Sequence, residues 1–442
     1  MPVIDLVSSD SDLPKKTTVA VIGGGIIGVA TALELAERGV SVVLLEKGII
    51  AGEQSSRNWG WCRQMGRDAR ELPLILESLK LWRGMNERVG AETGYRQSGI
   101  IYLAETEAEL AVKEKWYAEN AKAYGLATRL VSGSEADRLQ PGATRRWKGG
   151  LYTAEDGRAE PFLAVPAMAR HARKLGVKIL QNCAVRGVES SGGRIASVVT
   201  EKGAIACEQV VLAGGAWSRR FLHNLGIAFP QLSVVNSVMR TETLATGLET
   251  TCSGGKFAFR KRLDGGYTVT HRHTSVADIL PDSFRLFFPF LPALMLDWRG
   301  LRLRLGKRFI DEARLARRWR LDEPSPFEAV RMLDPEPVAA VLDEAAASLK
   351  AYYPAFADMR IAERWAGVID VTPDVVPVMS ALPGVDGLYL ASGFSGHGFG
   401  LGPGAGKLMA QLVVGEAPCV DPAPFRYGRY FDGSRPRPAT GP

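Results

Sequence analysis

Glycines at positions 23, 25 and 28 follow the spacing G-x-G-x-x-G and stand between an apolar run, residues 19–22, and a segment of helical periodicity. In a strand–turn–helix unit, Gly23 permits the tight turn, Gly25 lets the backbone approach a pyrophosphate at the positive end of the helix, and Gly28 allows close packing. Glu46 comes 18 residues after Gly28, at the end of the next apolar run. A carboxylate there accepts hydrogen bonds from a ribose, so these residues predict a bound dinucleotide.

A second glycine-rich stretch, residues 392–406, has glycine at seven of fifteen positions. Its aromatic and aliphatic neighbours argue against a flexible linker, and a helix-like period follows it. Glycine loops before a helix N-terminus can aim amide groups at negative charge, which a reduced flavin carries and a nicotinamide does not. Two further stretches, Ser55 to Asn58 and the strand end at Gly214 and Gly215, add polar groups and backbone near the dinucleotide. Together they favour FAD over NAD.

In their order along the chain, these motifs resemble the D-amino-acid oxidase superfamily of FAD-dependent oxidoreductases, the group of glycine oxidase, sarcosine oxidase and D-amino-acid dehydrogenase. The quoted stretches include "VAVIGGGIIGVATALELAERG", "SSRNWG", "VVLAGGAWS" and "GFSGHGFGLGPGAGKLMAQLV". The resemblance implies noncovalent FAD, because no cysteine or histidine for attachment is evident. The expected cofactor contacts are Gly23, Gly25, Ile26, Ile27, Gly28, Glu46, Lys47, Gln54, Ser55, Ser56, Asn58, Trp59, Gly60, Val185, Gly214, Gly215, Trp217, Gly396, His397, Gly398, Phe399 and Gly400.

The expected fold class is α/β, with a discontinuous Rossmann-type FAD-binding domain and a mixed-sheet α+β substrate domain. At 442 residues the chain exceeds a usual single core. We expect residues 17–90, 155–235 and 361–430 in the FAD domain, residues 91–154 and 236–360 in the substrate domain, and residues 1–16 and 431–442 as tails. Helices are expected near 72–89 and 106–125.

Substrate recognition departs from the pattern that the resemblance implies. D-amino-acid dehydrogenases commonly have an arginine two residues after the glycine of "WAGVIDVTPD", where it clamps the substrate carboxylate, and here that position is Ile369. By comparison with the sarcosine oxidase branch, Thr268 and Arg272 fall on the flavin face of a strand, since alternate residues share a face. We therefore expect Arg272 to bind a substrate carboxylate and His271 or Asp370 to contact the amine.

His397 is the fourth candidate for the catalytic site, although the neighbouring amides are the favoured contacts. A surface arginine on an edge strand remains the alternative for Arg272. Cys62 lies in a loop expected near the flavin, where inert packing is the usual role of a lone cysteine.

The resemblance implies oxidation of the C–N bond of an amino acid or N-substituted amino acid, with hydride transfer to the flavin and hydrolysis of the imine. Dioxygen or another electron acceptor would reoxidise the cofactor. One alternative is a flavoprotein dehydrogenase subunit that passes electrons from an amine to a partner protein or quinone. A third hypothesis is an NAD-dependent dehydrogenase or a non-enzymatic nucleotide binder.

The composition of the chain limits which partners, metal sites and cellular locations we expect. The net charge of +7 is spread along the chain without a nucleic-acid-binding module, which excludes a nucleic-acid partner. Five cysteines without a C-x-x-C pair argue against a metal site or a disulfide framework and favour the cytoplasm. Neither a secretory signal nor a membrane span is expected.

The stretch "LFFPFLPALML", followed by nine arginines and lysines between Arg299 and Arg320, could lie on an anionic membrane. The favoured interpretation is a buried helix followed by a solvated face, with the prolines at 289 and 292 disfavouring a regular helix.

Overall fold

The βαβ unit predicted near the N-terminus forms, and it builds the centre of a parallel sheet. The computed structural model describes residues 2–296, 298 and 300–439. β1 (Lys16–Ile22) leads through the glycine turn into α1 (Ile26–Glu37), and β2 (Val42–Leu45) then pairs with β1 in parallel. Val19 and Val21 enter one core and Ala20 and Ile22 another, as expected of a sheet that is covered on both faces.

The first sheet has the strand order β19-β20-β11-β1-β2-β8, and β10 and β9 extend it in antiparallel pairing beyond β11. Its other strands are β8 (Lys178–Leu180), β9 (Val185–Ser191), β10 (Arg194–Thr200), β11 (Gly203–Leu212), β19 (Val378–Ala381) and β20 (Leu388–Ser392). On one face, α1 packs with α3 (Leu72–Arg83), α7 (Pro161–Lys174) and α14 (Gly398–Val414) around a shared core. This mixed α/β architecture confirms the predicted fold class.

The second sheet has the order β17-β16-β12-β15-β14-β13-β4-β6-β5, with β18 beside β12. Its strands are β4 (Ile100–Ala104), β5 (Thr128–Ser132), β6 (Gly149–Thr153), β12 (Leu232–Thr241), β13 (Thr251–Gly254), β14 (Phe257–Lys261), β15 (Tyr267–His271), β16 (Ser275–Asp278), β17 (Leu301–Arg304) and β18 (Ile361–Val371). α13 (Ala339–Tyr352) covers β14 and β15. The expected boundaries assigned residues 361–371 to the FAD domain, but β18 pairs in this second sheet.

Shorter elements connect the two sheets, and β3 (Trp61–Cys62) and β7 (Gly157–Arg158) form a separate antiparallel pair. The helix expected over 72–89 is divided at Gly84 into α3 and α4, and the one expected over 106–125 is α5 followed by a π-helical turn, Tyr117–Ala121. The remaining helices are α2 (Gln54–Arg57), α4 (Met85–Val89), α5 (Glu107–Trp116), α6 (Gly133–Leu139), α8 (Ser218–Asn224), α9 (Pro281–Arg285), α10 (Phe287–Leu296), α11 (Lys307–Arg314) and α12 (Pro326–Ala329).

Most of the second glycine-rich stretch lies inside a helix and not in a ligand-binding loop, which corrects the expectation for this stretch. α14 begins at Gly398, so Gly402 and Gly406 face α1. A Cβ at Gly402 would lie 2.6 Å from Cγ1 of Ile26, and one at Gly406 would lie 2.5 Å from Cβ of Ala30. These glycines therefore let two helices touch, and the part of the stretch left to approach a ligand is the turn before Gly398 with the first residues of α14.

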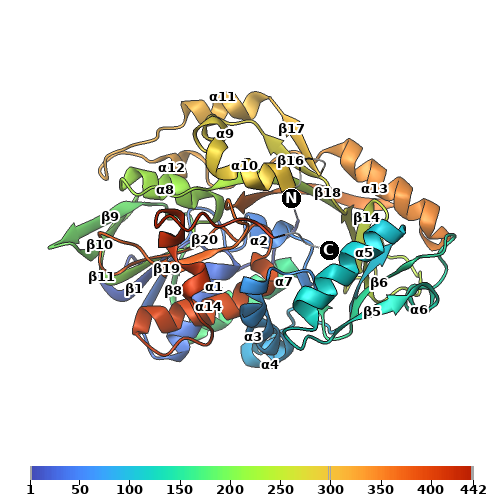
Figure 1. Cartoon of the computed structure of the whole chain (residues 1–442). Helices are drawn as coiled ribbons and strands as arrows, with labels where there is room; N and C mark the ends of the chain where they lie inside the picture. Colours follow the sequence, from blue (N-terminus) through green and yellow to red (C-terminus); the bar gives the residue numbers. More distant parts are fainter. Residues whose placement is uncertain (1, 297, 299, 440–442) are drawn as a thin grey trace.

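α10 forms a helix in spite of its prolines, and it is not buried. Together with α9 and α11 it lies at the top of the molecule in Figure 1, away from α3 and α4 at the bottom. Phe288 is 82% exposed and Met295 is 71% exposed, so the expectation of a buried helix is wrong. Arg299, the first residue of the basic run, lies outside the described residues. In the described part of the chain, no helix is both long and apolar enough to cross a membrane.

The N-terminal segment, expected to be a loose tail, is bound to the edge strand β8. The amide of Asp10 donates to the carbonyl of Ile179 at 2.7 Å, and the amide of Ile179 donates to Oδ2 of Asp10 at 2.9 Å. The side chain of Gln181 also donates to the carbonyl of Val7. Backbone groups that an edge strand leaves unpaired are satisfied in this way.

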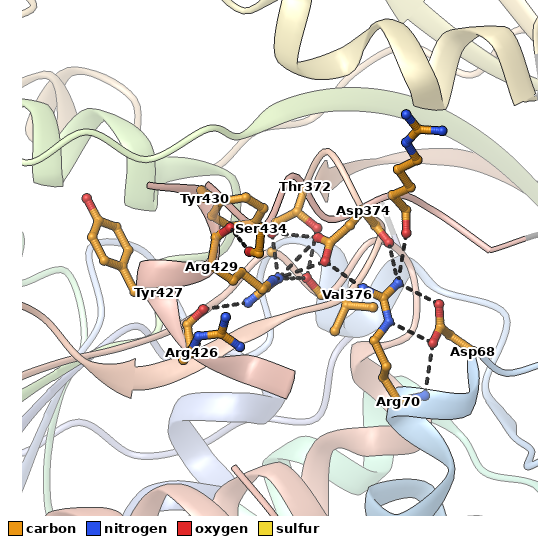
Figure 2. Close-up of polar contacts among 12 residues, drawn as sticks. Asp68, Arg70, Thr372, Asp374, Val376, Arg426, Tyr427, Arg429, Tyr430 and Ser434 are labelled. Carbon is orange, nitrogen blue, oxygen red and sulfur yellow. Dashed lines mark hydrogen bonds and ion pairs between the residues drawn. The ribbon is translucent and has the colours of Figure 1, made fainter. Parts of the chain in front are cut away.

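The C-terminal segment wraps the surface, as expected, but is held by a buried ion pair (Figure 2). Arg429, in a short 3₁₀ helix (Tyr427–Tyr430), donates through Nε to Oδ2 of Asp374 at 3.0 Å and through Nη2 to the carbonyl of Val376 at 2.7 Å. The Tyr430 hydroxyl lies 2.6 Å from Oδ1 of Asp374, and Arg70 adds a second guanidinium at 3.0 Å. Both Asp374 and Arg429 are buried. This network fixes the loop after β18.

We predict that Asp374→Ala lowers the free energy of unfolding by about 3–5 kcal/mol, because it leaves the Arg429 charge buried without its partner. Chemical denaturation of the FAD-bound protein measures the change. Asp432→Ala is the matched control, since Asp432 forms an exposed ion pair with Arg426 in the same segment, and exposed pairs contribute about 0–1 kcal/mol. Equal denaturation midpoints for the two variants would contradict the prediction.

Candidate active site

The carboxyl ends of β1, β2 and β11 meet the N-terminus of α1 around one cleft, which we call the cofactor cleft. Glu46 follows β2, and its carboxylate accepts from the amide of Gly24 at 2.6 Å and from the amide of Gly48 at 2.7 Å. Burial raises the pKa of Glu46, while Lys47 and the two amides oppose that shift. The carboxylate is thus fixed at the mouth of the glycine turn, in the position expected of a ribose acceptor.

The glycine turn itself is pressed against the next strand. Gly23 has a φ of +112°, and a Cβ there would lie 2.3 Å from the carbonyl oxygen of Ala213, just after β11. A Cβ at Gly28 would lie 1.9 Å from the carbonyl oxygen of Gly23, so this residue serves packing. Larger residues would push the turn out of the cleft.

Two residues of the loop after β2, Ser55 and Glu53, form hydrogen bonds in the wall of the cofactor cleft opposite the glycine turn. Oγ of Ser55 accepts from the amide of Ile26 at 2.8 Å, at the N-terminus of α1. The carboxylate of Glu53 accepts from Nζ of Lys47 at 2.7 Å and from Nε1 of Trp217 at 3.1 Å. Glu53 was missed by the sequence analysis, because an acidic residue in a polar loop carries no motif that sets it apart.

Sixteen of the expected cofactor contacts line this cleft. They are Gly23, Gly25, Ile26, Ile27, Glu46, Lys47, Gln54, Ser55, Asn58, Val185, Gly214, Gly215, Trp217, Gly396, Gly398 and Phe399. Oε1 of Gln54 is buried in this wall without a hydrogen-bond partner among the described residues, as a group that awaits a ligand would be. No described residue that lines the cleft is a cysteine or histidine.

Several expected contacts lie elsewhere. Three of them line neither the cofactor cleft nor the second cavity described next, namely Gly28, Ser56 and Gly60. Gly60 packs against the carbonyl of Ala159. Trp59, His397 and Gly400 line a second cavity, which we call the inner cleft. Cys62 is buried in β3 away from both, and burial raises the pKa of its thiol well above the ordinary value, which fits an inert packing role.

The inner cleft has a volume of about 450 Å³ and shares four lining residues with the cofactor cleft, so the two are adjacent. The shared residues are Gln54, Asn58, Gly396 and Phe399. Aromatic side chains, Trp59, Trp61 and Tyr102, form part of its wall, and arginines 57, 63, 67 and 272 project from several elements. The two clefts together have the form of a cofactor site beside a substrate site.

Arg272 lines the inner cleft, in agreement with the expectation for this residue. Its side chain is 6% exposed, its nearest carboxylate is Glu109 at 3.9 Å, and its Nη1 has no hydrogen-bond partner within the described chain. Thr270, two residues earlier, faces the same way and bonds Asn236 of the cleft wall. Thr268 does not reach the cleft and accepts from Arg262.

His271 points to the opposite face of β15, which corrects its assignment to the amine end of the substrate. Its Nδ1 accepts from the amide of Thr274 at 3.1 Å, and its Nε2 lies 3.7 Å from Glu344 on α13. Alternation along β15 explains this, since Thr270, the residue before His271, faces the wall of the inner cleft. His273 lines the inner cleft instead, where burial and Arg272 lower its pKa to about 4.

Asp370 lines the cofactor cleft and not the inner cleft, and its groups are already used. Its Oδ2 accepts from the amide of Gly393 at 2.7 Å and from Nε2 of Gln231 at 3.2 Å, while its carbonyl accepts from the amide of Ser395. Burial raises its pKa. Asp370 therefore holds the glycine turn before α14, and its predicted contact with the substrate amine is not supported.

His397 stands at the N-terminus of α14, on the wall of the inner cleft. Its Nδ1 lies 3.1 Å from Oε1 of the buried Glu71. Burial lowers the pKa of His397, although Glu71 opposes that shift. Nδ1 of the imidazole is used by Glu71, and Nε2 is the ring nitrogen left for a ligand.

Comparison with known proteins agrees with this geometry. The solved structure of L-amino acid deaminase from Proteus vulgaris superposes on this chain with a TM-score of 0.92, over 96% of this chain and 100% of that one. The two sequences are 36% identical. It is 25% identical to sarcosine oxidase subunit beta from Arthrobacter sp, over 95% of this chain and 93% of that protein. It is 26% identical to glycine oxidase from Pseudomonas aeruginosa, over 92% of this chain and 97% of that protein.

The family model for FAD dependent oxidoreductases matches residues 18–412, which include both clefts almost entirely. This excludes the NAD-dependent dehydrogenase among the initial hypotheses and confirms FAD as the cofactor. The chain belongs to the family of FAD-dependent oxidoreductases.

Proposed function

We propose that the protein oxidises the C–N bond of an amino acid or N-substituted amino acid with bound FAD. The observation that carries this proposal is Arg272, a buried guanidinium with an unpartnered nitrogen in a cleft that adjoins the cofactor cleft. A carboxylate is the partner that a buried arginine prefers. The relatives named above act on amino acids, and this supports the same substrate class here.

In this proposal FAD extends along the cofactor cleft, where the residues present fit its parts. Glu46 accepts from the ribose, and the N-terminus of α1 faces the pyrophosphate. Gly396, in the turn before α14, and Gly398, the first residue of α14, approach the flavin, and Gly396 lines both clefts. Bound FAD would supply the acceptor for two electrons, which leave the carbon that bears the amine as a hydride.

The side chains of the inner cleft position the substrate. Arg272 holds the carboxylate as a fork, which limits the rotation of the substrate over the cofactor. His397 replaces His271 and Asp370 as the candidate for the amine end, since it lines the inner cleft and Glu71 leaves its Nε2 unused. The aromatic wall of Trp59, Trp61 and Tyr102 limits the access of water.

The electron acceptor is dioxygen or another small acceptor in this proposal. The dehydrogenase subunit that passes electrons to a partner protein is the less favoured alternative. Oxygen consumption compared with dye reduction, at the same amino-acid concentration, separates the two.

Arg272→Lys tests the carboxylate clamp. Because lysine keeps the charge but loses the bidentate fork, we expect KM for amino acids to rise about tenfold or more, while simple amines are unaffected. Steady-state kinetics measure both constants. Arg240→Lys, on the same sheet but paired with Glu363 outside the clefts, is the control, and identical KM values for the two variants would remove Arg272 from the site.

Glu46→Ala tests the cofactor contacts. Loss of a charged acceptor for the ribose should weaken FAD binding by about 1.5–3 kcal/mol, measured by fluorescence titration of the apoprotein. Glu37→Gln, which alters a carboxylate on α1 paired with Arg88, should leave the dissociation constant unchanged. Equal affinity in Glu46→Ala and the unmodified protein would make Glu46 a merely structural residue.

Acid precipitation tests whether the flavin is free of a covalent bond. Since no cysteine or histidine lines the described cofactor cleft, we expect all of the flavin in the supernatant. Flavin that stays with the precipitated protein would show an attachment and contradict this expectation.

A further inference from the structure

The inner cleft carries more positive charge than one carboxylate requires. Among its described lining residues, Asp68 is the one carboxylate, and it is already paired with Arg70 at 2.7 Å. Arg57 has a carboxylate partner, since Nη1 lies beside Asp334 and also donates to the carbonyl of Ala366 at 3.0 Å, although its Nε has no partner among the described residues. Arg63, Arg67 and Arg272 remain, and none of them pairs with a carboxylate among the described lining residues. Glu109, which does not line the cleft, lies 3.9 Å from Arg272.

Arg67 is the residue that the proposed reaction leaves unexplained. It is 3% exposed, its Nε donates to the carbonyl of Arg63 at 3.2 Å, and its Nη1 has no partner in the described part of the chain. Burial, together with the neighbouring charge of Arg63, lowers its pKa to about 10. The buried carboxylates of Glu71 and Asp156 stabilise its charge, but neither forms an ion pair or hydrogen bond with it among the described residues. A buried nitrogen left without a partner is costly, so Nη1 points to an anion that arrives with a ligand.

Arg63 and Arg67 together form a second positively charged group in the inner cleft, besides Arg272. Its guanidinium lies 5.6 Å from the centre of the Tyr102 ring, and Nη1 donates to the carbonyl of Met65. Asp156 fixes the loop between the two arginines, because its Oδ1 accepts from the amide of Gln64 at 2.8 Å. The loop therefore presents two like charges to the same cavity, and an anion between them would relieve their repulsion.

The pair Arg63 and Arg67 lies on one wall of the inner cleft, and Arg272 lies on another. Arg67 lies beside the first turn of α14, where a Cβ at Gly400 would be 3.4 Å from its Nη2. Arg272 follows β15 and has Glu109 of α5 as its nearest carboxylate. One ligand that reaches both walls needs an anionic group at each end.

We propose that the inner cleft binds a substrate with two carboxylates, a dicarboxylic amino acid or N-substituted amino acid, whose second carboxylate binds Arg67 and Arg63. This rests on the proposed function for the first carboxylate, at Arg272. The amine-bearing carbon then lies between the two anion sites, which fixes the substrate at both ends. Monocarboxylic amino acids leave Arg67 buried and unpaired.

Calorimetric titration of the FAD-bound protein with glutarate and valerate tests the second site without turnover. The two probes have equal carbon chains and differ in one carboxylate. We expect glutarate to bind at least tenfold more tightly than valerate, and Arg67→Met to reduce that ratio to less than threefold with valerate unaffected. Arg83→Met, which removes an exposed arginine paired with Glu155, should keep the original ratio.

Equal affinities for glutarate and valerate in the unmodified protein would overturn the proposal, and so would an unchanged ratio in Arg67→Met. Arg63→Met, at a less buried position, gives the same comparison if Arg67→Met does not fold. Oxidation rates separate the two proposals. If norvaline is oxidised as efficiently as glutamate, the proposed reaction holds and the second anion site is excluded. If glutarate binding depends on Arg67 but no amino acid is oxidised, the second anion site holds and the proposed reaction is excluded.

Discussion

The contact between α1 and α14 is the constraint on which both clefts depend. Gly402 touches Ile26 and Gly406 touches Ala30, so each step of four residues along α14 matches a step of four along α1. The helices therefore run parallel and begin at the same edge of the first sheet. Two positive helix ends face the cofactor cleft, which suits a cofactor that carries a pyrophosphate and gains negative charge on reduction. Any side chain at these glycines would drive the helices apart.

The parts of the fold that could be predicted were those with local signals. The glycine turn, Glu46 and the buried strands of the βαβ unit follow from spacing and apolar runs. The role of the glycines after Gly398 could not be predicted in this way, since close helix packing and a ligand-binding loop both require glycine. Phe288 and its neighbours were expected in a core, because apolar composition does not say whether another element covers a helix.

In the candidate site, too, residues with a local signal could be predicted, and residues whose contacts depend on the tertiary structure could not. The comparison with the sarcosine oxidase branch, supported by alternation, placed Arg272 in the inner cleft but also placed Thr268 there, which does not reach it. Alternation would have sent His271 to the opposite face from Thr268 and Thr270. Asp370 was identified as a polar residue near the flavin, but its bonds to Gly393 and Gln231 depend on β18 and the glycine turn meeting in three dimensions. Arg63 and Arg67 carried no signal, since arginines in a polar loop are usually solvated.

Anaerobic reduction of the bound flavin is the measurement that tests the central claim, that the two clefts form one site for FAD and an amino acid. An amino acid added to the purified protein in the absence of oxygen should bleach the visible absorbance of the flavin, because the substrate carbon and the cofactor meet where the clefts adjoin. A protein that binds FAD in full but whose absorbance is changed by no amino acid or N-substituted amino acid would contradict the account.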